Sequence, residues 1–149
     1  MSFQLYTQEK HSTHQFILDQ IESAFQTTPN IASTLHGQRK IYQGCYGRRT
    51  SLFPSTKCGG AIPLESRLEL AHAIYLERNP IVNSFRTQAI KIPLSQTEYC
   101  YPDFLIQTID NQYEVHEIKP NIKSLPTQEL NRFNKVSILL SHIEVTFKL

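Results

Sequence analysis

The sequence predicts an α/β (α+β) fold in which helices flank one mixed β-sheet. Helical spacing of apolar residues occurs near the beginning, the middle and the end of the chain, and strand-like runs lie between these segments. The 149 residues contain no internal repeat and no linker, and their number suits one domain with a buried core. We therefore expect residues 1–149 to form a single domain.

The first helix is expected at residues 14–27, within an N-terminal helical segment of about residues 1–30. Thr13 is suited to cap this helix because its hydroxyl can accept a hydrogen bond from a free backbone N–H group. The apolar residues that recur at helical spacing are Phe16, Ile17, Ile21 and Phe25.

The next segment, residues 28–63, is rich in Thr, Ser, Gly and Pro, which predicts loops with a strand or two near residues 40–53. A second helix is expected from about residue 63 to residue 78. Pro63 suits its first turn, where no backbone donor is needed, and Asn79-Pro80 suits its end.

Four strands are expected after this helix. The first two are "IVNSFRTQ" (81–88) and "AIKIPL" (89–94), and the other two form a hairpin within "YPDFLIQTIDNQYEVHEIKP" (101–120). Asp110-Asn111 is an adequate turn for this hairpin. A last helix from Thr127 through Leu140 and a strand at residues 143–149 complete the pattern.

Polar side chains gather at the open end of the predicted hairpin. Asp103 begins its first strand, and alternation along residues 113–119 places Glu117 and Lys119 on one face of the second. Antiparallel pairing about the turn brings residues 103 and 117 to the same end of the ladder. Two carboxylates and an ammonium group are therefore expected to converge.

This set of groups points to metal-dependent hydrolysis of a phosphodiester. Neighbouring carboxylates repel unless positive charge lies between them, and Mg²⁺ accepts such oxygen ligands while it keeps bound water. The cation lowers the pKa of that water, and a lysine beside it can stabilise developing negative charge. Each motif also has an ordinary structural interpretation, since Glu-x-Lys is often a surface ion pair and Pro-Asp is often a turn.

The combination of Pro-Asp, Glu-x-Lys and a preceding helix that carries an acid resembles the PD-(D/E)xK nuclease superfamily. Within it, residues 55–120 look most similar to the TnsA-type transposon endonucleases. The matching elements are Ser66-Arg67-Leu68-Glu69, Glu77 at the helix end, Asn79-Pro80-Ile81-Val82, Gln88, Pro102-Asp103-Phe104 and Glu117-Ile118-Lys119-Pro120.

This resemblance implies a restriction-endonuclease-like fold with a catalytic core at about residues 50–149. The implied catalytic residues are Glu69, Asp103, Glu117 and Lys119. Mg²⁺, with Mn²⁺ as a substitute, would be held by Glu69, Asp103, Glu117 and Ile118, and Gln88 would support the site. Glu65 remains the alternative to Glu69 because the two share a helix face, whereas Glu77 is expected in an exposed ion pair, for instance with Arg78.

The family also implies a function and partners. TnsA-type proteins nick the 5′ ends of a transposon in double-stranded DNA, beside a DDE transposase subunit and under an AAA+ regulator. Many of them continue into a winged-helix-like domain, whereas about thirty residues follow Lys119 here, so we expect the nuclease domain only. The alternatives are a stand-alone restriction, repair or junction-resolving nuclease of the same fold, and a non-catalytic DNA-binding or assembly subunit.

Charge and composition limit these possibilities only loosely. A net charge of +2 does not by itself indicate nucleic acid, but residues 37–67 are locally basic, and we expect Arg48, Arg49 and Lys57 to contact phosphates. A solvated loop face would look the same. Three scattered cysteines, no long apolar run and no leader segment predict a cytoplasmic protein without a membrane span. His72 and His116 are expected to be ordinary structural histidines.

Overall fold

The computed structural model describes residues 2–29, 34–35, 37–38 and 50–149. Two of the predicted phosphate contacts, Arg48 and Arg49, lie outside the described residues. The strand region predicted at 40–53 is described only from residue 50 onward.

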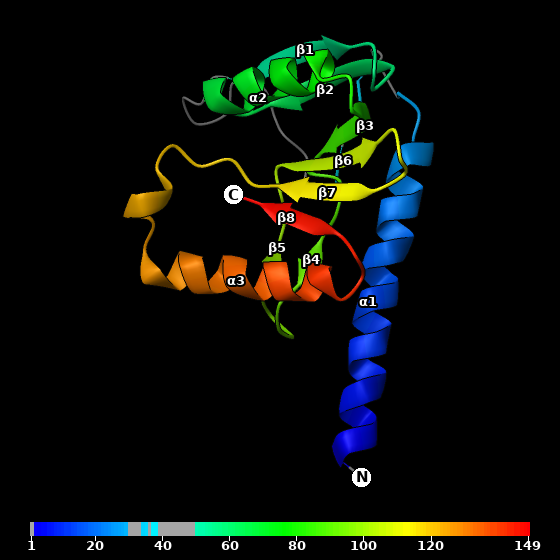
Figure 1. Ribbon diagram of the computed structural model, residues 1–149, viewed down its shortest axis with the longest axis vertical. Helices are drawn as coiled ribbons and strands as arrows, with labels where there is room; N and C mark the ends of the chain where they lie inside the picture. Colours follow the sequence, from blue (N-terminus) through cyan, green and yellow to red (C-terminus); the bar gives the residue numbers. More distant parts are fainter. Residues whose placement is uncertain (1, 30–33, 36, 39–49) are drawn as a thin grey trace.

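A four-stranded mixed sheet forms the centre of the fold (Figure 1). The order across the sheet is β3-β6-β7-β8, in which the first three strands are antiparallel and β8 runs parallel to β7. The α/β prediction is therefore confirmed, and each of these strands falls within a predicted segment. Their bounds are β3 Val82–Thr87, β6 Phe104–Thr108, β7 Tyr113–His116 and β8 Thr146–Lys148.

Helices cover both faces of this sheet (Figure 1). Alternation along β6 sends Leu105 to one face and Ile106 to the other. The Leu105 face packs against α1 (Ser2–Gln26) and α3 (Thr127–Ser141), and the Ile106 face packs against α2 (Arg67–Arg78). Within the described residues, no helix has both the length and the apolar character of a membrane span.

The first helix is longer than its apolar pattern predicts. α1 begins at Ser2 instead of residue 14, so Thr13 lies inside the helix and does not cap it. Residues 2–13 contain no Gly or Pro that would end a helix. Their few regularly spaced apolar residues explain why the periodicity became visible only after residue 14.

The second helix begins later than predicted because a hairpin precedes it. β1 (Ser51–Ser55) pairs with β2 (Gly60–Leu64) through a turn in which Gly59 has a φ of +75°, a conformation that favours glycine. Pro63 therefore lies in a strand and not in a first helical turn. The helix starts after Ser66, whose hydroxyl accepts the N–H of Glu69 at 3.1 Å.

The predicted strand at residues 89–94 is reduced to a short pair. β4 (Ile92–Pro93) joins β5 (Tyr99–Cys100) in a separate two-stranded sheet, and β5 was not predicted. After β7 a short 3₁₀ helix, η3 (Ile122–Ser124), leads to α3. Cys58 and Cys100 are buried free thiols, whereas Cys45 lies outside the described residues.

Candidate active site

The open end of the β6–β7 hairpin brings Asp103 and Glu117 together. Phe104 pairs with His116, so the two acids lie opposite each other one residue beyond the ladder. The backbone N–H of Asp103 donates to Glu117 Oε2 at 3.2 Å, and the N–H of Ile118 donates to Asp103 Oδ2 at 2.8 Å. Each carboxylate is thus held by the backbone of the opposite strand, as the predicted register requires.

Lys119 lies beside this pair. Its Nζ atom is 3.4 Å from Glu117 Oε1, and the ammonium group also lies over the ring of Phe133 at 5.6 Å from the centroid. β7 ends at His116, but side chains continue to alternate beyond it. Glu117 and Lys119 both line the same cavity, which shows that they lie on the same side of the chain. The expected meeting of two carboxylates with one lysine is therefore observed.

The cavity at this position has a volume of about 210 Å³. α3 supplies part of its wall, so the cavity lies between the hairpin mouth and that helix. One water needs roughly 10–15 Å³ of such cavity space, so the cavity has room for several waters or a small polar group. The lining residues are Gln88, Cys100, Tyr101, Asp103, Glu117, Lys119, Glu129, Arg132 and Phe133.

Burial makes Glu117 an unusual carboxylate. Its residue surface is only 8% exposed. Burial first, and then the charge of Asp103, raise its pKa to about 7, while the nearby Lys119 acts in the opposite direction. Additional positive charge would stabilise the ionised form. The site therefore has the electrostatic character that a divalent cation would relieve.

Gln88 braces Asp103 from the end of β3. Its Nε2 donates to Asp103 Oδ1 at 3.2 Å, and its backbone N–H donates to the Asp103 carbonyl at 3.1 Å. The backbone of Gln88 has a φ of +49°, which is uncommon for residues other than glycine. Its Oε1 is buried without a hydrogen-bond partner in the described part of the chain. Gln88, which the family resemblance predicted as a supporting residue, thus makes direct contact with Asp103.

Glu69 lies in the first turn of α2. Its Oε2 accepts the backbone N–H of Glu65 at 3.0 Å, so the carboxylate also serves the start of the helix. Burial raises the pKa of Glu69, and the charge of Asp103 raises it further, against the opposing hydrogen bond from Glu65. The charge of Asp103 therefore acts on Glu69, but Glu69 is not among the described residues that line the cavity. Glu65 precedes α2 and does not lie in the helix, so the choice between the two acids stays a prediction.

The expected metal ligands do not form a ready cluster. Among the described residues, no three His, Cys, Asp or Glu side chains come together as a group that could hold a metal ion. The oxygens of Asp103 and one oxygen each of Glu117 and Glu69 are engaged with N–H donors. The oxygen chemistry and the raised pKa of Glu117 nevertheless fit a hard cation, and the Mg²⁺ site stays a prediction.

Two other expected residues have structural contacts. Lys57 Nζ donates to the carbonyls of Leu76, at 2.9 Å, and Asn79 at the end of α2, so its ammonium group is engaged and is not a free surface charge. The prediction that Glu77 forms an exposed ion pair is wrong. Its carboxylate accepts the Ser55 hydroxyl at 2.6 Å and the N–H groups of the β1–β2 turn, because α2 packs beside that turn.

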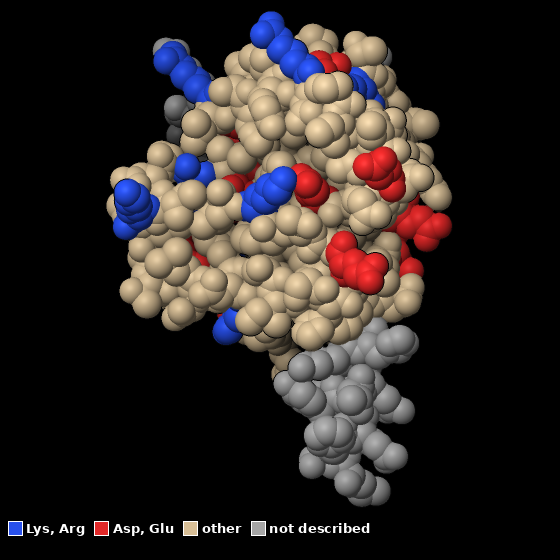
Figure 2. Space-filling view, viewed as in Figure 1, with Lys and Arg blue, Asp and Glu red and all other residues tan. Residues whose placement is uncertain are grey.

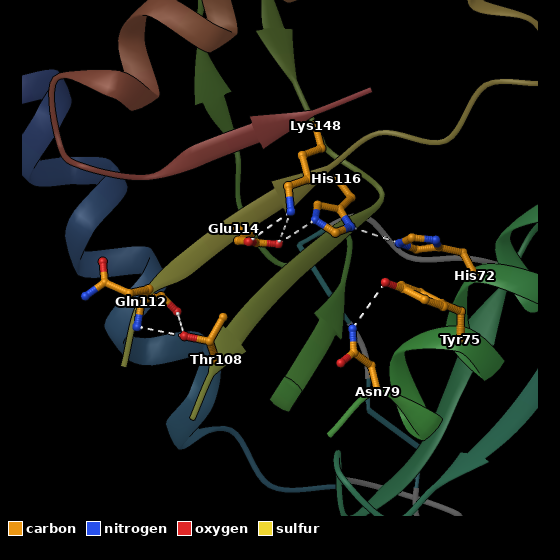
Figure 3. A network of polar contacts seen from close by, with 8 residues as sticks. All are labelled: His72, Tyr75, Asn79, Thr108, Gln112, Glu114, His116 and Lys148. Carbon is orange, nitrogen blue, oxygen red and sulfur yellow. Dashed lines mark hydrogen bonds and ion pairs between the residues drawn. The ribbon is translucent and has the colours of Figure 1, made fainter. Parts of the chain in front are cut away.

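A polar chain that the sequence did not reveal lies in contact with α2 (Figure 3). His72 Nε2 is 2.9 Å from His116 Nδ1, His116 Nε2 is 2.9 Å from Glu114 Oε2, and Lys148 Nζ donates to Glu114 at 3.0 Å. Burial, and then His116, lower the pKa of His72 to about 4. Alternation along β7 was the available signal, since it places Glu114 and His116 on one side and Glu117 on the other.

The surface charge is dispersed on the face that Figure 2 shows. Lys and Arg side chains lie there as separate groups, and several Asp and Glu side chains gather toward the right of that view. This distribution agrees with the small net charge of +2. On this face no single basic patch stands out among the described residues.

Comparison with known proteins adds no family assignment. Neither the available models of protein families nor the curated proteins include a match to this chain. The resemblance of residues 55–120 to TnsA-type endonucleases therefore remains a proposal, and the geometry of the hairpin mouth is the main basis for a function.

Proposed function

We propose that this chain is a Mg²⁺-dependent endodeoxyribonuclease. The observation that carries the proposal is the cavity in which Asp103, Glu117 and Lys119 meet at one end of the β6–β7 hairpin. A surface ion pair would account for Glu117 and Lys119 alone. It would not account for a buried glutamate, only 8% exposed, beside a second carboxylate that Gln88 braces.

Each residue has a distinct part in the proposed reaction. Asp103 is fixed through both oxygens, so its carboxylate keeps one orientation. Glu117 faces Asp103 across the hairpin mouth and would offer a second carboxylate to a cation once it is ionised. Lys119 places positive charge where a phosphoryl oxygen would become more negative.

A divalent cation would complete this site. Asp103, Glu117 and the backbone carbonyl of Ile118 would hold Mg²⁺ or Mn²⁺, with Glu69 nearby on α2. The cation would supply Lewis acidity and a bound water of lowered pKa. Its charge would also offset the repulsion that raises the pKa of Glu117.

The proposed substrate and partners follow from the resemblance to the TnsA-type family. The chain would nick double-stranded DNA at the 5′ ends of a transposon, inside the cell, with a DDE transposase subunit and an AAA+ regulator. The order of the S-x-L-E, N-P-x-V, P-D-F and E-x-K-P elements supports this assignment. A stand-alone nuclease would use the same cavity, and a non-catalytic subunit would have no need of it.

Plasmid cleavage separates these possibilities. Supercoiled plasmid DNA is incubated with the protein and Mg²⁺ or Mn²⁺, alone and with a DDE transposase as the candidate partner. Cutting only with the partner supports the transposon function, and cutting without it supports a stand-alone nuclease. DNA binding without cutting under either condition supports the non-catalytic role.

Asp103→Ala tests whether cutting depends on this site. We expect it to abolish cleavage while the protein stays folded, as judged by circular dichroism. Asp110→Ala is the matched control, because Asp110 is an exposed acid at the other end of the same hairpin. Equal activity of wild type and Asp103→Ala would exclude Asp103 from the reaction.

A further inference from the structure

A second positively charged side chain, that of Arg132, lines the proposed active site beside Lys119. Arg132 lies on α3 and contributes to the same cavity as Asp103, Glu117 and Lys119, although it is distant from all three in the sequence. Cys100 also lines the cavity. Burial is the main cause that raises the pKa of its thiol; Glu117 and Asp103 raise it further, whereas Arg132 and Lys119 lower it. The four charges therefore surround one place.

The guanidinium group of Arg132 is positioned but keeps unused donors. Its Nη2 donates to the carbonyl of Tyr99 at 2.6 Å, which anchors the side chain to β5. Its Nε is buried and has no hydrogen-bond partner among the described residues. The Nε atom lies 3.8 Å from Glu98 Oε1, but half of that glutamate side chain is exposed, and such an ion pair contributes little.

The charges of the lining decide which ligand fits. Arg132 and Lys119 face three carboxyl groups, those of Asp103, Glu117 and Glu129. With all of these ionised the lining has a net charge of minus one and disfavours an anion. A bound divalent cation would reverse this sign. An anion would therefore enter together with the cation, which is the condition for a nuclease substrate.

We propose that Arg132 binds a backbone phosphate of the DNA substrate in this cavity and positions it against the carboxylate pair. Its planar fork of N–H donors matches the oxygens of a phosphate, and lysine cannot reproduce that geometry. Lys119, from the chain after β7, would contact the same phosphodiester. This inference rests on the proposed endonuclease function.

The test measures DNA affinity in Ca²⁺, which occupies oxygen sites and is used here to limit cleavage. The probe is a fluorescent DNA duplex of mixed sequence. We expect Arg132→Gln to weaken binding by about tenfold or more and to reduce the slope of log affinity against log salt by about one. Arg132→Lys should recover the salt slope but not the full affinity. Lys135→Gln, at an exposed site on α3, is the control.

Cleavage rates then distinguish positioning from folding. In Mg²⁺, with the transposase if cutting requires it, Arg132→Gln should raise the DNA concentration for half-maximal rate, whereas Asp103→Ala should abolish the rate at saturation. If wild type binds and cuts DNA and Arg132→Gln matches it, the assignment of Arg132 is wrong but the endonuclease function stands. If wild type neither binds nor cuts, both are wrong. If Arg132→Gln lowers the melting temperature, the DNA affinity of Arg132→Lys is the deciding measurement. An affinity equal to that of wild type would refute a contact that needs the planar guanidinium group.

Discussion

Glu117 should make the protein less stable as pH rises when no cation is present. The Glu117 residue is 8% exposed, and the pKa of its carboxyl group is about 7, compared with 4.5 for an ordinary glutamate. Between these two values the folded protein keeps a proton that the unfolded chain has released. Because the unfolded state then binds fewer protons, the free energy of unfolding falls as pH rises and levels off above about pH 7.

The size of this effect follows from the difference between the two pKa values. A difference of about 2.5 corresponds to about 3 kcal/mol for complete titration, and about 2–3 kcal/mol of it falls between pH 5 and pH 8. Glutamine cannot titrate. Glu117→Gln should therefore gain this amount relative to wild type on going from pH 5 to pH 8, whatever its constant effect on packing.

Urea unfolding in EDTA at the two pH values measures this change. Wild type and Glu117→Gln are compared with Glu22→Gln, which removes an exposed glutamate of α1. Adding Mg²⁺ at pH 8 should stabilise wild type and leave Glu117→Gln unchanged. If the stability difference between Glu117→Gln and wild type is the same at pH 5 and pH 8, the pKa of the Glu117 carboxyl group is not raised in the folded protein.

Three further changes test other parts of the structure. Lys119→Ala should reduce cleavage by about a hundredfold or more with little change in melting temperature, and exposed Lys123→Ala should not; equal rates would exclude the lysine. Gly37→Ala should destabilise the protein by about 2 kcal/mol in urea unfolding, because its Cβ would clash with the carbonyl oxygen of Gln88; wild-type stability would contradict this packing. The pKa of His72 lies near 4 instead of 6.5, so the unfolded chain binds the extra proton and stability should fall as pH drops from 6.5 toward 4. In thermal unfolding, the melting temperature of His72→Asn should fall less than that of wild type over this pH range. The same pH dependence in both proteins would contradict the lowered pKa.

The hairpin and the meeting of its polar residues could be predicted because both depend on local rules. Alternation along a strand and a turn at Asp110-Asn111 fix which residues face each other, so the neighbourhood of Asp103 and Glu117 follows from short spacings. Gln88 also lies in contact with Asp103 because it follows the adjacent strand of the sheet.

Other features depend on contacts between distant segments. Pro63 suits a helix start as well as an edge strand, and only pairing with β1 selects the strand. Glu77 and Lys57 resemble surface charges until α2 packs on the β1–β2 turn. Arg132 reaches the cavity only because α3 folds back against the hairpin mouth, and no spacing in the sequence encodes that approach.

Cation binding is the most direct test of the proposed site. Titration calorimetry with Mn²⁺ at pH 8 should give a site in wild type that is lost in both Asp103→Asn and Glu117→Gln and kept in Asp110→Asn. Proton release on binding should increase as pH is lowered toward 7, because the cation displaces the proton of Glu117. Absence of Mn²⁺ binding in wild type, or binding that survives in both site variants, would contradict a cation site at the hairpin mouth.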